Sequence, residues 1–144
     1  MKHLGYCGFA LIMLVVCSIA SCKKEPLDGA WAPMEMDKNN ITISLAGGSD
    51  TIRLLNYPGW ILSSVSARVN DTIITRYPQW NGNDSVFYNM VGEWYKVRIP
   101  REDPQMLVVE CQENPKLDRR ELYISVNLGD VWGTIYVYQS PWGI

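Results

Sequence analysis

Three tyrosines near the C-terminus have the side-chain chemistry and the spacing to contact a ligand. Apolar residues alternate with other residues through the two segments that contain them, which predicts two strands. A tight turn at Gly129-Asp130 places Tyr123 opposite Tyr136, with Tyr138 further along the same face and Glu121 beside it. Exposed tyrosine rings can stack on the C–H faces of a sugar or contact a partner protein.

A second group of aromatic and polar residues lies in the long segment 67–91. Amide and carboxylate groups next to exposed rings are what a sugar-binding loop needs, because sugar hydroxyls take part in hydrogen bonds. The group consists of Tyr77, Trp80, Asn81, Asn83 and Asp84.

Both groups also have a purely structural alternative. The tyrosines can form cross-strand aromatic pairs that stabilise a sheet, or a neighbouring loop can cover them. Trp80 can anchor its loop on the core. The side-chain oxygens in Asn81-Gly-Asn-Asp84 could bind calcium, but these residue types are also those of an ordinary turn, which we favour.

The N-terminus has the order of features typical of a secretory signal peptide. Lys2 is followed by an uncharged apolar run over residues 4–19, and small residues at 20 and 21 precede Cys22. This order resembles the lipobox of bacterial lipoproteins, which implies cleavage before Cys22 and lipidation of its thiol. The sequence therefore predicts a signal peptide over residues 1–21, a flexible tether over 22–38 and one domain over 39–144.

Cleavage at this position removes most of the residues that could support catalysis. His3, Cys7 and Cys17 leave with the signal peptide, so the remaining chain holds no histidine and, besides Cys22, only Cys111. Ser-His, Cys-His and His-metal sites are thereby excluded, and we expect no enzyme activity, cofactor or metal site. Carboxylate pairs such as Glu93 with Glu102 or Asp103 stay formally possible, since glycoside hydrolysis needs only two acids.

The charge of the remaining chain gives no strong preference for a partner. Loss of Lys2 leaves 12 of the 13 basic residues against 15 acidic ones, a formal balance of −3. No basic stripe is present, so nucleic acid is not an expected partner.

From residue 39 onward the hydrophobic period is two, which predicts an all-β fold. With Gly47-Gly48 as a turn, the first two strands form a hairpin in which Ile43 lies opposite Ile52 and Ile41 opposite Leu54. Further strands are expected at residues 60–66, 72–77, 85–89, 94–99 and 106–112. This spacing favours a single antiparallel β-sandwich.

Three residues are expected inside the sandwich because of their position in these strands. Cys111 shares a face with Leu107 and Val109, so we expect a buried, unreactive thiol. Trp60 and Trp94 are expected in the core near strand ends.

Several short motifs follow one another along the predicted strands: WILSSV, GEWYKV, LVVECQEN, RRELYISV and GTIYVYQS. They contain Trp60, Asn114 ahead of Arg119-Arg120, and Val137-x-Gln139. Their order resembles the BACON domain of secreted and outer-membrane proteins of gut-associated Gram-negative bacteria. The resemblance spans residues 41–140. It implies an immunoglobulin-like β-sandwich, and the name of that domain records a proposed carbohydrate-binding role.

Together these features predict a non-catalytic lipoprotein of the outer membrane that holds a carbohydrate-binding module. Its expected partners are the membrane, through the lipid on Cys22, and a glycan such as mucin. The expected ligand-binding residues are Tyr123, Tyr136, Tyr138, Trp80, Tyr77 and Asn81. The alternative is a structural or accessory subunit of an outer-membrane protein complex, and display on the cell surface or in the periplasm stays open.

Three triplets resemble the Asp-Ser/Thr-apolar motif at which such bacteria attach O-glycans. They place possible acceptors at Thr51, Thr72 and Ser85.

Overall fold

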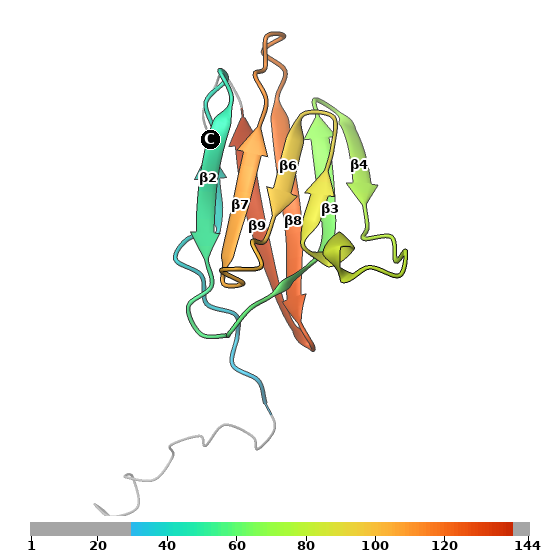
Figure 1. The fold of residues 1–144 in the computed structure, drawn as a ribbon. Coiled ribbons are helices and arrows are strands. Elements are labelled where there is room, and N and C mark those ends of the chain that lie inside the picture. The colour runs from blue at the N-terminus through green and yellow to red at the C-terminus, as the bar shows by residue number, and fades with distance from the viewer. Residues whose placement is uncertain (1–29, 140–144) are drawn as a thin grey trace, which may run out of the picture. The chain divides into compact units, whose positions relative to one another are not determined.

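The computed structural model describes residues 30–139, so the predicted signal peptide 1–21 and the lipidation site Cys22 lie outside the described residues. This part of the chain is a sandwich of two β-sheets and contains no α-helix (Figure 1). The five-stranded sheet has the order β1 (Asn40–Thr42), β9 (Val131–Gln139), β8 (Arg120–Leu128), β3 (Ile61–Val69) and β4 (Thr72–Arg76). The four-stranded sheet has the order β2 (Gly48–Arg53), β7 (Met106–Cys111), β6 (Tyr95–Arg98) and β5 (Asn89–Val91). The predicted all-β sandwich is therefore confirmed.

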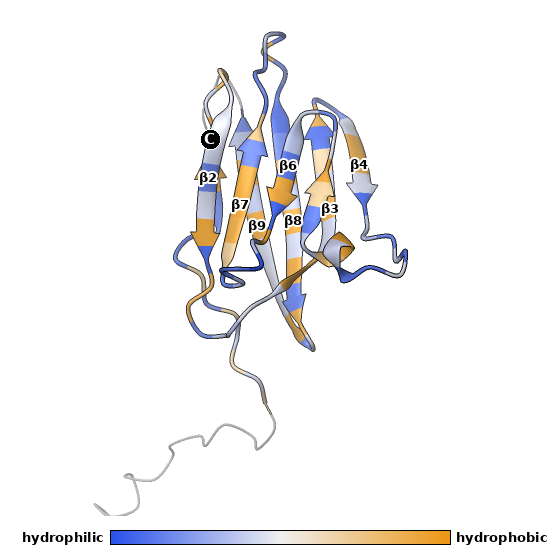
Figure 2. Ribbon diagram, viewed as in Figure 1, coloured by the Kyte–Doolittle hydropathy of each residue, from blue (hydrophilic) through white to orange (hydrophobic). Residues whose placement is uncertain are grey.

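The core lies between the two sheets and follows the period of two in the sequence. Leu122, Ile124 and Val126 of β8, for example, have no exposed surface, while Tyr123 and Ser125 between them are partly exposed. Figure 2 shows this alternation as hydrophobic and hydrophilic bands along the strands. Each buried valine, leucine or isoleucine contributes roughly 1.5–3 kcal/mol. The fully buried aliphatic residues include Leu62, Val65, Val97, Leu107, Val109, Leu122, Ile124 and Ile135.

The residues predicted to be interior are buried. Trp60 and Trp94 are 2% and 6% exposed, and Cys111 is a buried free thiol. Leu107 and Val109 lie in the same core cluster as Cys111.

The C-terminal hairpin forms in the predicted register. Tyr123 pairs with Tyr136, Ile124 with Ile135, and Glu121 with Tyr138. Gly129 adopts a φ of +58° in the turn, a conformation that a glycine takes at little cost.

The predicted N-terminal hairpin is wrong in its pairing. The first strand, β1, pairs in parallel with β9, and the second, β2, pairs antiparallel with β7 of the opposite sheet. Ile41, Ile43, Ile52 and Leu54 are all buried as predicted, because each strand turns its apolar face to the same core from its own sheet. Alternation alone does not distinguish two paired strands from two facing strands.

The Gly47-Gly48 pair makes this crossover between the sheets possible. Gly47 has a φ of +85° and Gly48 a φ of +144°, both accessible to glycine. A Cβ on Gly47 would lie 2.9 Å from the carbonyl oxygen of Cys111 and 2.9 Å from the backbone nitrogen of Glu113. Gly47 therefore allows two backbone segments to approach each other closely, and it does not form the turn of a hairpin.

The predicted strand 85–89 is also wrong in part. Residues Asp84–Phe87 form a short 3-10 helix, η2, and β5 begins only at Asn89. The Asn83 side chain accepts a hydrogen bond from the backbone N–H of Ser85 and caps the helix. Such a cap competes with strand formation, which explains the difference.

The C-terminal part of the predicted tether, residues 32–38, is attached to the sandwich. Glu35 accepts from the backbone N–H of Leu55 (2.9 Å), and Asp37 donates to the carbonyl of Arg53 (3.0 Å). Met34 and Met36 are partly buried against the core, whereas Trp31 is 69% exposed. Within the described residues the folded unit therefore begins before residue 39.

Candidate functional site

The candidate site is the outward face of the five-stranded sheet around Tyr123, Tyr136 and Tyr138, which we call the tyrosine face. Its register brings together residues from all five strands. One row across the sheet runs Asn40, Tyr136, Tyr123, Ser66 and Thr75, and the adjacent row runs Thr42, Tyr138, Glu121, Arg68 and Ile73.

The three tyrosines remain partly exposed on this face. The long segment 67–91 does not bury them; its first part instead extends the same sheet as β4. The rings of Tyr123 and Tyr136 lie 5.7 Å apart, centroid to centroid, at an interplanar angle of 88°. This edge-to-face pair stabilises the sheet, and its geometry leaves the two rings in different orientations toward solvent.

Glu121 is a carboxylate held at the centre of the second row with only 2% of its surface exposed. Its Oε2 accepts a hydrogen bond from the hydroxyl of Tyr123 (2.6 Å) and one from the guanidinium of Arg68 (3.3 Å). Its Oε1 accepts from Arg119 at 2.6 Å. Burial raises the pKa of Glu121, but the bonds from Tyr123 and Arg119 and the two cations outweigh burial and lower the pKa.

This network fixes the orientation of Tyr123. The bond to Glu121 is the main cause that raises the pKa of Tyr123, so the phenol stays neutral. The guanidinium carbon of Arg68 lies 5.8 Å from the centre of its ring. A ring held from two sides loses little conformational entropy when a ligand binds.

Small hydroxyl side chains occupy the sheet next to the tyrosines. Ser66 lies directly across from Tyr123, and the hydroxyl groups of Ser66 and Thr75 are 2.8 Å apart. Ser125 and Thr134 form the neighbouring pair on β8 and β9. Short side chains with hydroxyl groups therefore lie beside the aromatic rings and offer hydrogen-bonding groups to a ligand.

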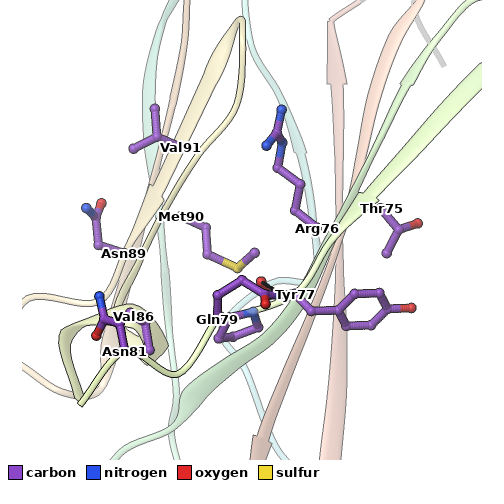
Figure 3. Close-up of a pocket in the computed structure, with 10 residues that line it drawn as sticks. Thr75, Arg76, Tyr77, Gln79, Asn81, Val86, Asn89, Met90 and Val91 are labelled. Atoms are coloured by element: carbon purple, nitrogen blue, oxygen red, sulfur yellow. Dashed lines mark hydrogen bonds between the residues drawn. The ribbon is translucent and has the colours of Figure 1, made fainter. Parts of the chain in front are cut away.

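Tyr77 follows directly after β4 and lines one groove together with Gln79 and Asn81 of the loop group in which the sequence placed it. Figure 3 shows the side chains of Thr75 and Tyr77 on one side of β4, with Arg76 and Met90 on the other. Tyr77 is 62% exposed. Thr75 lies in the row of Ser66 and Tyr123, so Tyr77 is two residues beyond that row along the chain.

An open groove lies between the end of β4 and β5, and Thr75 and Tyr77 line it together with loop residues. The groove has a volume of about 500 Å³, and Gln79, Asn81, Asn89 and Met90 contribute to its lining (Figure 3). Trp80 is 64% exposed, and its ring centroid lies 6.1 Å from that of Phe87. The structure thus brings Tyr77 and Asn81 of the predicted loop group into the lining of one groove and leaves Trp80 exposed.

The loop asparagines already have hydrogen-bond partners within their turn. Asn81 accepts from the backbone N–H of Asn83 (3.1 Å), and Asn83 accepts from that of Ser85 (3.0 Å). Residues 30–139 contain no group of three or more histidine, cysteine or acidic side chains arranged to hold a metal ion.

The predicted O-glycan acceptors differ in exposure. Thr51 on β2 and Thr72 on β4 are exposed, whereas Ser85 is half-buried in η2. Attachment at these residues stays a prediction.

Sequence reasoning missed the part played by Arg68 and Ser66 in the site. The strand predicted over 60–66 extends to Val69, and its pairing with β8 is what brings Arg68 opposite Glu121. The alternation of small and apolar residues in Ser64–Arg68 was a usable signal for the longer strand. Its partner could not be read from that signal, because the two strands are far apart in sequence.

Within the described part of the chain, no helix has the length and hydrophobicity to cross a membrane. No family model matches the chain, and no curated protein matches it. Among solved structures, the fold is similar to the NMR structure of a protein from Bacteroides thetaiotaomicron, with a TM-score of 0.58 and 21% sequence identity. The match covers 83% of this chain and 97% of that chain, and at this identity it shows a shared β-sandwich fold alone.

Proposed function

We propose that this protein is a non-catalytic, BACON-like lipoprotein of the outer membrane that binds carbohydrate on the tyrosine face. The observation that carries the proposal is the set of partly exposed rings, Tyr123, Tyr136 and Tyr138, beside a floor of serine and threonine hydroxyls. A sugar presents C–H groups to an aromatic ring and hydroxyls to polar neighbours, and this face offers both kinds of contact.

The ionisation state of the carboxylates supports ligand binding over catalysis of glycoside hydrolysis. The one nearly buried carboxylate of the face, Glu121, is held by Tyr123 and Arg119, and its lowered pKa keeps it ionised near neutral pH. A general acid for glycoside hydrolysis needs a raised pKa and a second carboxylate at a set distance. Asp103, one of the acids considered for such a pair, is bound to Arg53 at 2.7 Å.

A glycan array with the full chain and two substitutions tests this proposal. Tyr136→Ser should abolish the signal because it removes a ring from the centre of the face, and it should lower the free energy of unfolding by up to about 1 kcal/mol. Trp80→Ser is the matched control, since it removes an exposed ring from the separate loop and should leave the signal unchanged.

The opposite pattern of results would reassign the site. Loss of binding in Trp80→Ser alone would move it to the groove between β4 and β5. If no glycan binds but a membrane protein co-purifies with the parent chain and not with Tyr136→Ser, the face contacts a protein partner and the carbohydrate proposal is wrong.

A further inference from the structure

The four sheet edges of the sandwich differ in how they are protected against pairing with another strand. β1 and β5 are three residues long. β2 is longer, but it carries Asp50, paired with Lys38 at 2.8 Å, and Arg53. Short length and charge are common means by which proteins block edge-to-edge association.

β4 has less of this protection, because its only charged residue is the last one. It is five residues long, all of them exposed, and uncharged until Arg76. Ile73 and Ile74 are 49% and 50% exposed, on opposite faces of the strand. An exposed edge of β-branched residues is a template for a further strand.

The backbone of β4 has hydrogen-bonding groups available on its free side. The turn at Asn70-Asp71 makes Val69 and Thr72 the first pair of the β3–β4 hairpin. In such a hairpin Thr72, Ile74 and Arg76 bond to β3, while Ile73 and Thr75 direct their N–H and C=O groups outward. Within residues 30–139 the only strand that pairs with β4 is β3.

An apolar cavity lies beside Ile74 on the inner side of β4. Its volume is about 230 Å³. The half-exposed side chain of Ile74 shows that the core does not close over this part of the strand. The cavity is lined by Ala67, Val69, Thr72, Ile74, Arg76, Glu93, Trp94 and Tyr95.

We propose that β4 pairs antiparallel with β4 of a second copy of this chain. A second copy is the expected partner because the sequence of β4 is complementary to itself in an antiparallel pair. A two-fold axis at Ile74 places Ile73 opposite Thr75 and Thr72 opposite Arg76, so no like charges face each other. The outward backbone groups of Ile73 and Thr75 then bond across the axis, and the two Ile74 side chains meet over the cavities.

The pairing joins two five-stranded sheets edge to edge. The two-fold axis is perpendicular to the joined sheet, because paired residues of antiparallel strands point to the same side. The tyrosine faces of both copies therefore lie on one side of the dimer. The proposal itself depends only on β4 and stands whether or not that face binds carbohydrate.

Cysteine cross-linking of the full chain in detergent tests the register. Opposite residues of a non-hydrogen-bonded pair have Cα atoms about 4.5 Å apart, within the range of a disulfide, so Ile74→Cys should form a disulfide-linked dimer. Thr72→Cys is the matched control, since its two copies lie about 13 Å apart along the strands and should not be linked. Peptide mapping distinguishes a bond at position 74 from one that involves a native cysteine.

Sedimentation of the full chain in detergent gives an independent measurement. Ile74→Lys places two ammonium groups opposite each other and should raise the dimer dissociation constant at least about tenfold. Val91→Lys, at a residue 57% exposed on the β5 edge, should leave it unchanged. Equal cross-linking at positions 72 and 74, or a parent chain that stays monomeric at every concentration measured, would show that the proposal is wrong.

Discussion

At the scale of single residues, buried polar side chains form hydrogen bonds with backbone carbonyls. Gln139 has no exposed surface, and its Nε2 donates to the backbone carbonyls of Ser44 (2.9 Å) and Gln112 (2.8 Å). Asn114 is 1% exposed, and its Nδ2 donates to the carbonyl of Asp118 at 2.7 Å. Two residues that carried the family resemblance therefore have structural roles, since they satisfy backbone groups that are costly to leave unpaired.

Cys111 is expected to be unreactive while the domain is folded. Burial raises the pKa of its thiol to about 12, although the charge of Arg120 lowers it in part. The thiolate is the reactive form, so at pH 8 a thiol reagent should modify Cys111 slowly in the native chain and rapidly in denaturant. Peptide mapping after timed labelling measures this, and rapid native labelling at Cys111 would contradict it.

Glu121 should make the stability of the domain depend on acid pH. Its folded pKa is lowered below the ordinary value of 4.5, so the unfolded chain binds more protons in this window. The contribution is fully present above about pH 4.5 and is lost as the pH falls through the folded pKa. Denaturant unfolding at pH 3 to 7 should show a smaller decrease for Glu121→Gln than for the parent chain, and parallel curves would refute this role.

At the scale of elements, the crossover from β1 to β2 decides how the sheets are composed. Ile43 donates its N–H to the carbonyl of Tyr138 at 2.9 Å, which continues the parallel pairing of β1 with β9. Gly47 then donates to the carbonyl of Ser44 at 3.0 Å and turns the chain toward the opposite sheet. The two strands thus cover the core from both sides instead of lying side by side.

Gly47→Ala should destabilise the domain because of this crossover. The substitution imposes a Cβ at a φ of +85° and brings it 2.9 Å from the carbonyl oxygen of Cys111, so we expect a loss of at least about 1–3 kcal/mol. Gly129→Ala is the control, since its φ of +58° is also unfavourable but nothing lies within 4 Å of its Cβ. Thermal unfolding should therefore show a larger decrease for Gly47→Ala, and equal decreases would argue against the close backbone approach.

At the scale of the whole molecule, we propose that a lipid on Cys22 tethers the described domain to a membrane. The segment that joins them is partly fixed, because residues 32–38 bond along residues 53–57. The anchor itself lies outside the described residues and rests on the sequence around Cys22.

Cys22→Ala should release the protein from membranes. Two acyl chains on one residue give stable anchoring that a single chain does not. Fractionation of cells that express the full chain should place the parent in the membrane fraction and the variant in the soluble fraction. Retention of the variant after washing would mean that another segment holds the protein at the membrane.

The sequence by itself determined which residues face the core and which face outward. Because side chains alternate with a period of two, Leu122 and Ile124 had to lie together, and Tyr123 had to point away from them. The Gly129-Asp130 turn also determined the register of β8 with β9, since a short turn joins strands that are adjacent in the chain.

Only the tertiary structure decided how distant strands are combined. The pairing of β1 with β9 and the position of Arg68 opposite Glu121 join segments that the sequence separates widely. Ile41 and Ile52 satisfy the same alternation whether their strands are paired or face each other across the core, so the local pattern has no preference between them. The choice depends on how all the strands pack at once. For the same reason, the hydroxyl groups of Ser66 and Thr75 come to lie beside Tyr123 only in the folded chain.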